Sequence, residues 1–172
     1  MTTTLRRLGG AMLVSVLATA AMAQDSTAKV ATMTDWSVFA EESPKECWGV
    51  SAPKETVNTK GGKPVSVRRG DILLFVTFKP GKPGEVSFSG GYPFEGGSTV
   101  TMEVDGTTFN LVTEGEWAWT SGPEEDVKVL AAMKQGADAK MTGHSAKGTQ
   151  TVDTFSLRGF TAAMEEAGKQ CQ

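Results

Sequence analysis

The chain has 172 residues, with 17 basic and 20 acidic side chains, a formal net charge of −3 and a mean hydropathy of −0.20. This slightly acidic balance makes nucleic acid a poor partner, because phosphate backbones are bound by basic surfaces. One histidine and two cysteines cannot build a usual transition-metal site if the cysteines pair with each other. We therefore expect no metal and no other cofactor.

The first 23 residues have the pattern of an export signal. Arg6 and Arg7 precede an apolar run over residues 11–20, and the small-residue sequence Ala21-Met-Ala23 follows. The run is shorter than the roughly 20 residues that cross a bilayer, so we predict cleavage before Gln24 and no transmembrane segment afterwards. The protein is therefore expected outside the cytoplasm.

Without the signal, 149 residues remain, of which 15 are basic and 20 acidic. This length fits one domain with a substantial core. We predict a flexible leader over residues 24–34, where the side chains are small and polar, and a single domain over residues 35–172.

Cys47 and Cys171 are predicted to form a disulfide. The thiols of an exported chain meet oxidising conditions, in which two cysteines normally pair. A catalytic thiol would need a nearby base and an electropositive setting, whereas the only histidine is His144 and Glu46 adjoins Cys47. We therefore expect a crosslink and not a nucleophile.

Short segments of alternating apolar and polar residues dominate the chain and predict an all-β fold. Residues 35–40 and 47–52 alternate in this way, and the second segment places Cys47 on the face opposite to Trp48. Residues 71–78 are apolar on both sides, which is typical of a central strand covered by two layers. With roughly nine strands and two short helices, a β-sandwich is favoured, and a closed barrel is the alternative.

Asp105-Gly106 between the alternating runs 99–104 and 107–112 predicts a hairpin with a type I′ turn. This turn fixes the register of the two strands and gives the hairpin one apolar face. The predicted cross-strand pairs are Val104 with Thr107, Met102 with Phe109, and Val100 with Leu111.

A first helix is predicted from Pro123 to about Gly136, with Ser121 as its cap and acidic residues 124–126 in its first turn. Its expected core-facing stripe consists of Val127, Leu130 and Met133.

A second helix is predicted to begin near Gly159. Its core-facing positions are spaced 4, 3 and 4 residues apart, so the thiol of the last one points toward the body of the protein. These positions are Phe160, Met164, Ala167 and Cys171.

Residues 53–70 hold five basic side chains and one acidic one, and their Gly, Pro and Thr content predicts a long loop. One reading is a loop that binds polyanions; the other is a loop that is merely solvated. The candidate polyanion contacts are Lys60, Lys63, Arg68 and Arg69.

Two groups of aromatic residues have alternative readings. Trp117 and Trp119 lie on one face of a predicted strand, where core packing is favoured over stacking on sugars because large aromatics dominate sandwich interiors. Tyr92, Pro93 and Phe94 lie in a glycine-flanked loop and are predicted to form an exposed contact patch.

We predict that the protein is not an enzyme. Acidic pairs such as Glu114 and Glu116 resemble glycosidase acid and base residues, but nothing in the sequence places them across a cleft. A polar pocket around Glu114, Glu116 and His144 is the arrangement that would support an unrecognised active site.

Several motifs in a fixed order closely resemble the invasion associated locus B family, from about Trp36 to Cys171. They are 46–54 (ECWGVSAPK), 67–72 (VRRGDI), 91–100 (GYPFEGGSTV), 113–115 with the tryptophan pair, and 155–163 (FSLRGFTAA) with the late cysteine. The resemblance implies a periplasmic or surface-associated protein of Gram-negative bacteria. It also implies an immunoglobulin-like β-sandwich, a disulfide between Cys47 and Cys171, and a link by name to host-cell entry. It offers no catalytic residues.

The expected function is therefore that of an exported, non-enzymatic binding protein. Its partner is expected to be a protein or polymer of the bacterial envelope or the host surface. The alternatives are a periplasmic envelope-stress or chaperone-like protein, and an enzyme with an unrecognised site.

Overall fold

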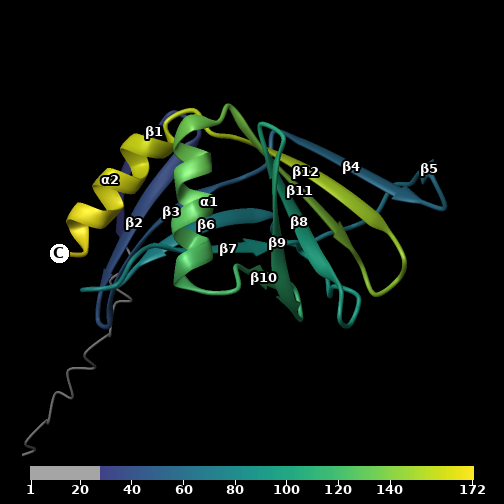
Figure 1. Ribbon diagram of the computed structural model, residues 1–172, viewed down its shortest axis with the longest axis horizontal. Helices are drawn as coiled ribbons and strands as arrows, with labels where there is room; N and C mark the ends of the chain where they lie inside the picture. Colours follow the sequence, from purple (N-terminus) through teal and green to yellow (C-terminus); the bar gives the residue numbers. More distant parts are fainter. Residues whose placement is uncertain (1–27) are drawn as a thin grey trace, which may run out of the picture.

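The computed structural model describes residues 28–172, so the predicted signal and the first residues of the predicted leader lie outside the described chain (Figure 1). Two helices accompany the strands, α1 (Pro123–Gln135) and α2 (Phe160–Gln170). The strands are β1 (Ala28–Met33), β2 (Trp36–Glu42), β3 (Lys45–Ser51), β4 (Glu55–Lys60), β5 (Lys63–Pro64), β6 (Leu73–Phe78), β7 (Glu85–Ser89), β8 (Thr99–Val104), β9 (Thr107–Glu114), β10 (Trp117–Trp119), β11 (Asp138–His144) and β12 (Gln150–Ser156).

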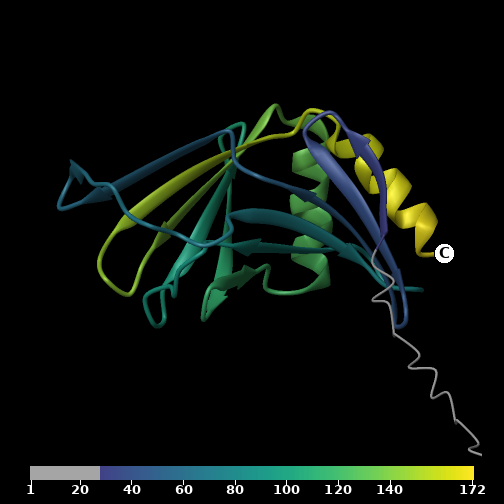
Figure 2. The same cartoon turned by 180° about the vertical axis from the view of Figure 1, so that it is seen from behind.

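All strands belong to one antiparallel sheet with the order β1-β2-β3-β6-β7-β10-β9-β8-β11-β12-β4-β5. The prediction of a mostly β fold with two helices is confirmed. The hydrogen bonds link the strands into a single bent sheet and do not divide them into two, so the immunoglobulin-like arrangement stays a prediction. Figures 1 and 2 show α2 beside β1–β3 at one end of the molecule and β4 and β5 at the other.

The core lies between the two halves of the bent sheet. The rings of Phe88 on β7 and Phe155 on β12 meet edge to face, with centroids 6.0 Å apart. Trp36 on β2 is fully buried, and its indole Nε1 donates a hydrogen bond of 3.0 Å to the carbonyl oxygen of Ser156. Long-range contacts of this kind bury large aromatics with their polar atoms satisfied.

Two elements have the structure that their local sequence predicts, the hairpin of β8 and β9 and the helix α2. The predicted hairpin is confirmed, because Val104 pairs with Thr107 and both Asp105 and Gly106 have positive φ, as a type I′ turn requires. The predicted face of α2 is also confirmed, since all four of the predicted positions, Phe160, Met164, Ala167 and Cys171, are buried.

The prediction of a loose leader is wrong for residues 28–33, which form β1 and pair with β2. The prediction of a long loop over residues 53–70 is also wrong in part, because β4 pairs with β12 and β5 pairs with β4. Neither β1 nor β4 has a buried apolar face. Their sequences therefore lack the alternation of apolar and polar residues that predicts the other strands.

The predicted core-facing stripe of α1 is confirmed for Met133, which is buried, and for Leu130, which packs against the core, but it is wrong for Val127. Val127 is 58% exposed, whereas Asp126, Val129 and Met133 are buried. Asp126 turns inward because its Oδ1 accepts hydrogen bonds from the Val86 backbone N–H (2.9 Å) and the Thr120 hydroxyl (2.6 Å). The residue before the helix is Gly122, with no side-chain cap, so Ser121 does not cap the helix.

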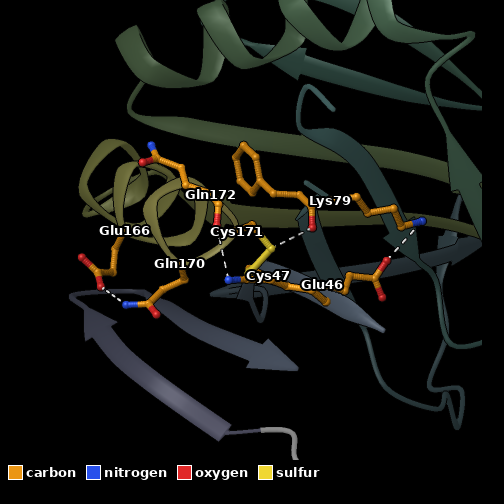
Figure 3. The surroundings of a disulfide bond; sticks show 9 residues. Glu46, Cys47, Lys79, Glu166, Gln170, Cys171 and Gln172 are labelled. Atoms are coloured by element: carbon orange, nitrogen blue, oxygen red, sulfur yellow. Dashed lines mark hydrogen bonds and ion pairs between the residues drawn. A yellow bond between two sulfur atoms is a disulfide. The ribbon is translucent and has the colours of Figure 1, made fainter. Parts of the chain in front are cut away.

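The predicted disulfide is confirmed and joins the end of α2 to β3 (Figure 3). The Cα atoms of Cys47 and Cys171 are 5.7 Å apart, and both side chains are buried beside Ala40 and Phe78. Next to it, the Lys45 ammonium donates a hydrogen bond of 3.3 Å to the carbonyl oxygen of Gln172. The last residues of the chain are thereby tied to an early hairpin.

Both helices pack on the core side of the sheet, and within residues 28–172 neither covers the opposite face. The rings of Trp36 and Phe160 are 4.9 Å apart, which places α2 on the core side. Two predictions are therefore wrong: β6 is covered on one side only, and the tryptophan pair is outside the core. Ala118 is fully buried, whereas its neighbour Trp117 is 38% exposed.

Candidate functional site

A cleft of about 450 Å³ lies where the segment after β5, the loop after β7 and the turn between β11 and β12 meet. These three segments are far apart in the sequence. The residues that line the cleft include Val67, Arg68, Arg69, Tyr92, Pro93, Glu116, Ser145, Lys147 and Thr151. The structure therefore brings parts of two separately predicted groups to a single site: Arg68 and Arg69 of the basic contacts, and Tyr92 and Pro93 of the aromatic loop.

A buried ion pair forms the floor of the cleft. Arg69 Nη1 and Nη2 donate hydrogen bonds of 2.7 and 2.6 Å to the two carboxylate oxygens of Asp153 on β12. The side chains of Arg69 and Asp153 are only 5% and 0% exposed. Parallel bonds between a guanidinium and a carboxylate are strong and directional, so they hold both side chains in one orientation.

Further hydrogen bonds satisfy the ion pair on both sides. Arg69 Nε and Nη2 donate to the carbonyl oxygen of Gly90, at 2.9 and 2.7 Å. The Thr56 hydroxyl on β4 donates to Asp153 Oδ1 at 3.0 Å. Buried charges are tolerated when they are paired and hydrogen-bonded in this way. Every polar atom of the two side chains is therefore engaged in at least one hydrogen bond.

Tyr92 packs against the guanidinium of the ion pair and lines the cleft beside it. Its hydroxyl is 2.6 Å from the Thr151 hydroxyl, and the Arg69 guanidinium carbon lies 4.9 Å from the centre of its ring, as in a cation–π contact. Burial raises the pKa of Tyr92 above its ordinary value, while the bond to Thr151 opposes this shift. The ring is therefore a neutral and preorganised wall of the cleft.

Glycine allows the two segments under the ring to approach each other. Gly91 has φ of +69°, and the Gly70 N–H donates a hydrogen bond of 2.8 Å to its carbonyl oxygen. A Cβ at Gly91 would lie 2.7 Å from the carbonyl oxygen of Gly70, too close for any side chain. Gly91 therefore lets the aromatic loop settle onto the basic segment.

Positive charge predominates around the mouth of the cleft. Arg68 and Lys147 are exposed and line it, and the exposed Lys60 donates a hydrogen bond of 2.8 Å to the carbonyl oxygen of Lys147. Glu116 is the acidic residue among the lining side chains. The rim can therefore attract a negatively charged group, while the floor is electrically neutral.

Two of the predicted contact residues have other roles. Arg69 is buried and already paired with Asp153, so it is not available to a polyanion, and the prediction is wrong for this residue. Phe94 is 6% exposed and packs on Phe88 and Tyr92, so it belongs to the core and not to a contact patch. Pro93 is exposed and Tyr92 is partly exposed, as the contact patch requires.

The remaining candidates lie around the cleft or away from it. Lys63 is exposed on β5, beyond the lining residues. Of the three residues named for an active site, Glu116 alone lines the cleft, whereas Glu114 and His144 do not. Within residues 28–172, no three histidine, cysteine or acidic side chains are grouped as metal ligands. No helix of this part of the chain is long and apolar enough to cross a membrane.

Sequence reasoning missed Asp153 and Thr151, which hold the floor of the cleft. Both lie on β12 at alternate positions, on its buried face. One signal for Asp153 was present in the sequence. Residues 150–156 predict a strand, and an aspartate at a core-facing position of a strand needs a buried partner.

Comparisons with known proteins cover most of the described chain. The family model described as Invasion associated locus B (IalB) protein matches residues 36–168. A crystal structure of invasion associated protein B from Bartonella henselae is similar, with a TM-score of 0.55 and 15% identity, covering 80% of this chain and 94% of that one. No curated protein matches the sequence.

Proposed function

Because the chain belongs to the invasion associated locus B family, we propose that it is an exported envelope protein that acts by binding and not by catalysis. We further propose that its cleft receives an acidic group of a surface polymer. The observation that carries this proposal is the combination of a rigid neutral floor with a cationic rim in one preformed cleft. Small-molecule and polymer sites are usually concave and largely preformed, as this one is.

The floor supports binding because it needs no rearrangement when a ligand enters. Arg69 and Tyr92 are held by Asp153 and Thr151 before any ligand arrives, so little conformational entropy is lost on binding. The same bonds occupy the guanidinium and the carboxylate, which argues against their use as catalytic acid or base.

The rim supports an acidic ligand. Arg68, Lys147 and Lys60 are exposed cations around the mouth, and the one opposing charge among the lining residues is Glu116. Carboxylate and phosphate groups of envelope polymers carry the complementary charge. An export signal and a location in the periplasm or at the cell surface are part of the proposal, as is a link to host-cell entry.

The proposal is tested by reversing the charge of the rim. The triple variant Lys60→Glu, Arg68→Glu, Lys147→Glu is expected to bind immobilised lipopolysaccharide or heparin on the order of 10- to 100-fold more weakly, since each exposed ion pair contributes about 0.5–1 kcal/mol. The loss should be largest at low ionic strength, where screening is weak.

A matched triple reversal at exposed lysines away from the cleft serves as the control: Lys82→Glu, Lys134→Glu and Lys169→Glu. It changes the net charge by the same amount, so it should retain most of the binding. Equal weakening in both triple variants would assign the effect to net charge alone and refute a role for the cleft. Wild-type protein that binds neither polymer would refute an acidic ligand.

A further inference from the structure

A row of large aromatic side chains lies on the face of the sheet opposite the core. Both helices pack on the other side, since Val129 and Met133 of α1 and the buried positions of α2 belong to the core. We call this row the aromatic face. Its members are Phe39 on β2, Trp48 on β3, Phe75 on β6, and Trp117 and Trp119 on β10.

The rings of the aromatic face contact one another across several strands. The centroid of Phe39 is 5.8 Å from that of Trp48, and the two rings are nearly parallel. Farther along, Trp117 lies 5.6 Å from Phe75 and 6.2 Å from Trp119. In register, Val50 lies opposite Phe75, which connects the two groups of rings.

The strands cannot turn these rings into the core, because the alternate positions already fill it. Leu74 and Val76 flank Phe75, and Ala118 separates the two tryptophans; all three are fully buried. The rings therefore remain partly exposed to water. Contiguous exposed apolar surface of this kind is uncommon on soluble proteins and is typical of binding surfaces.

Negative charge predominates around the aromatic face. Glu114 lies directly opposite Trp117 in the strand register, and Glu85 lies opposite Thr77, two residues along β6 from Phe75. Glu41 and Glu46 form a cross-strand pair next to Phe39 and Trp48. Two cations lie nearby: Lys79, which is engaged by Glu46 at 3.1 Å, and Lys29, which lies opposite Phe39 in the strand register. The surface therefore favours a positively charged partner and disfavours an anionic one.

We propose that the aromatic face binds an extended, lysine- or arginine-bearing segment of a partner protein. Alternate side chains of an extended chain are roughly 6.6 Å apart, which is close to the ring spacings of 5.6 and 6.2 Å. Each cation would lie over a ring while a carboxylate such as Glu114 or Glu85 neutralises it. This surface is distinct from the cleft, and the inference goes beyond the proposed function.

The test uses the full mature chain and a peptide of four Arg-Thr repeats, titrated while tryptophan fluorescence is recorded. We expect a saturable change in fluorescence that weakens with salt. The double variant Trp117→Ala, Trp119→Ala is expected to bind the peptide at least about tenfold more weakly, because two cation–π contacts are lost. Its binding is measured by calorimetry, since part of the fluorescence signal is lost with the indoles.

Glu114→Gln should weaken binding several-fold, while the matched control Glu165→Gln, an exposed acid on α2, should leave it unchanged. The triple reversal at the rim of the cleft should not weaken it, which separates this surface from the proposed function. Four outcomes would overturn the inference: no saturable binding, equal binding by the double variant, preference for a chitin or cellulose oligosaccharide over the peptide, or sedimentation showing that a second copy covers the face.

Discussion

The disulfide and the buried ion pair both join late parts of the chain to early ones. Cys47 and Cys171 are 124 residues apart, and Arg69 and Asp153 are 84 residues apart. The disulfide restricts the unfolded chain, since its two ends stay joined after the fold is lost. The ion pair acts in the folded state alone, where each charge is tolerable because the other is present.

This difference teaches that similar long-range links stabilise the fold for different reasons and leave different groups behind when they are broken. Losing the disulfide removes a constraint but leaves nothing unpaired in the folded protein. Losing one charge leaves the other buried without its partner, whereas losing both charges can be nearly neutral if apolar groups fill the space.

Removal of the disulfide should have the largest effect on stability. The double variant Cys47→Ala, Cys171→Ala is expected to lower the free energy of unfolding by about 5 kcal/mol, from the chain-entropy estimate for a loop of 124 residues. Denaturant titration measures the loss. Wild type with a reductant present provides the control and should lose a similar amount; an unchanged midpoint would show that the constraint contributes little.

Breaking one side of the ion pair should have the next largest effect. Arg69→Met or Asp153→Leu alone is expected to lower the free energy of unfolding by about 3–5 kcal/mol, because a buried charge is left unpaired. The double variant should recover most of this loss, and denaturant titration of all four proteins gives the coupling energy.

The exposed pair of Lys140 and Glu103, with both side chains 48% exposed, serves as the comparison. Glu103→Gln should change the free energy of unfolding by about 1 kcal/mol or less. If the single variants at Arg69 and Asp153 lower the free energy of unfolding as little as Glu103→Gln does, the buried pair is not what stabilises the floor of the cleft.

Tyr92→Phe should have a much smaller effect than the loss of either long-range link, about 1 kcal/mol from the lost hydrogen bond to Thr151. Because the folded-state pKa of Tyr92 is raised, its contribution is fully present below about pH 10 and is lost as the pH rises through the folded value. Wild type should therefore lose stability more steeply than the variant in alkaline solution. Tyr92 is the only tyrosine, so tyrosinate absorbance follows it alone; ionisation at the ordinary pKa would contradict the buried setting.

Several features of this protein follow from the sequence alone because they depend on local geometry. The Asp105-Gly106 turn sets the register of its hairpin through the backbone conformation of two residues. The spacing from Phe160 to Cys171 sets the buried face of α2 through the helical period. The pairing of two cysteines was predicted from their number and from the proposed export to an oxidising compartment.

The tertiary structure alone decided which side of an alternating strand became the core. The pattern around Trp117, Ala118 and Trp119 specifies two faces, but both faces of such a strand can be apolar, and the small Ala118 was the one buried. Which face is buried depends on the neighbouring strands and helices that pack against it. The local sequence of the strand contains no information about those neighbours.

Tertiary structure also decided the roles of the charged residues in the cleft. Arg69 lies in a run that predicts a solvated basic loop, and Asp153 lies on a strand 84 residues later. A single charged residue is costly to bury, so each one by itself predicts an exposed position. When the fold brings Arg69 and Asp153 together, their pairing offsets the cost of burial. The same pairing holds the basic segment beside the aromatic loop, so that the two form one cleft.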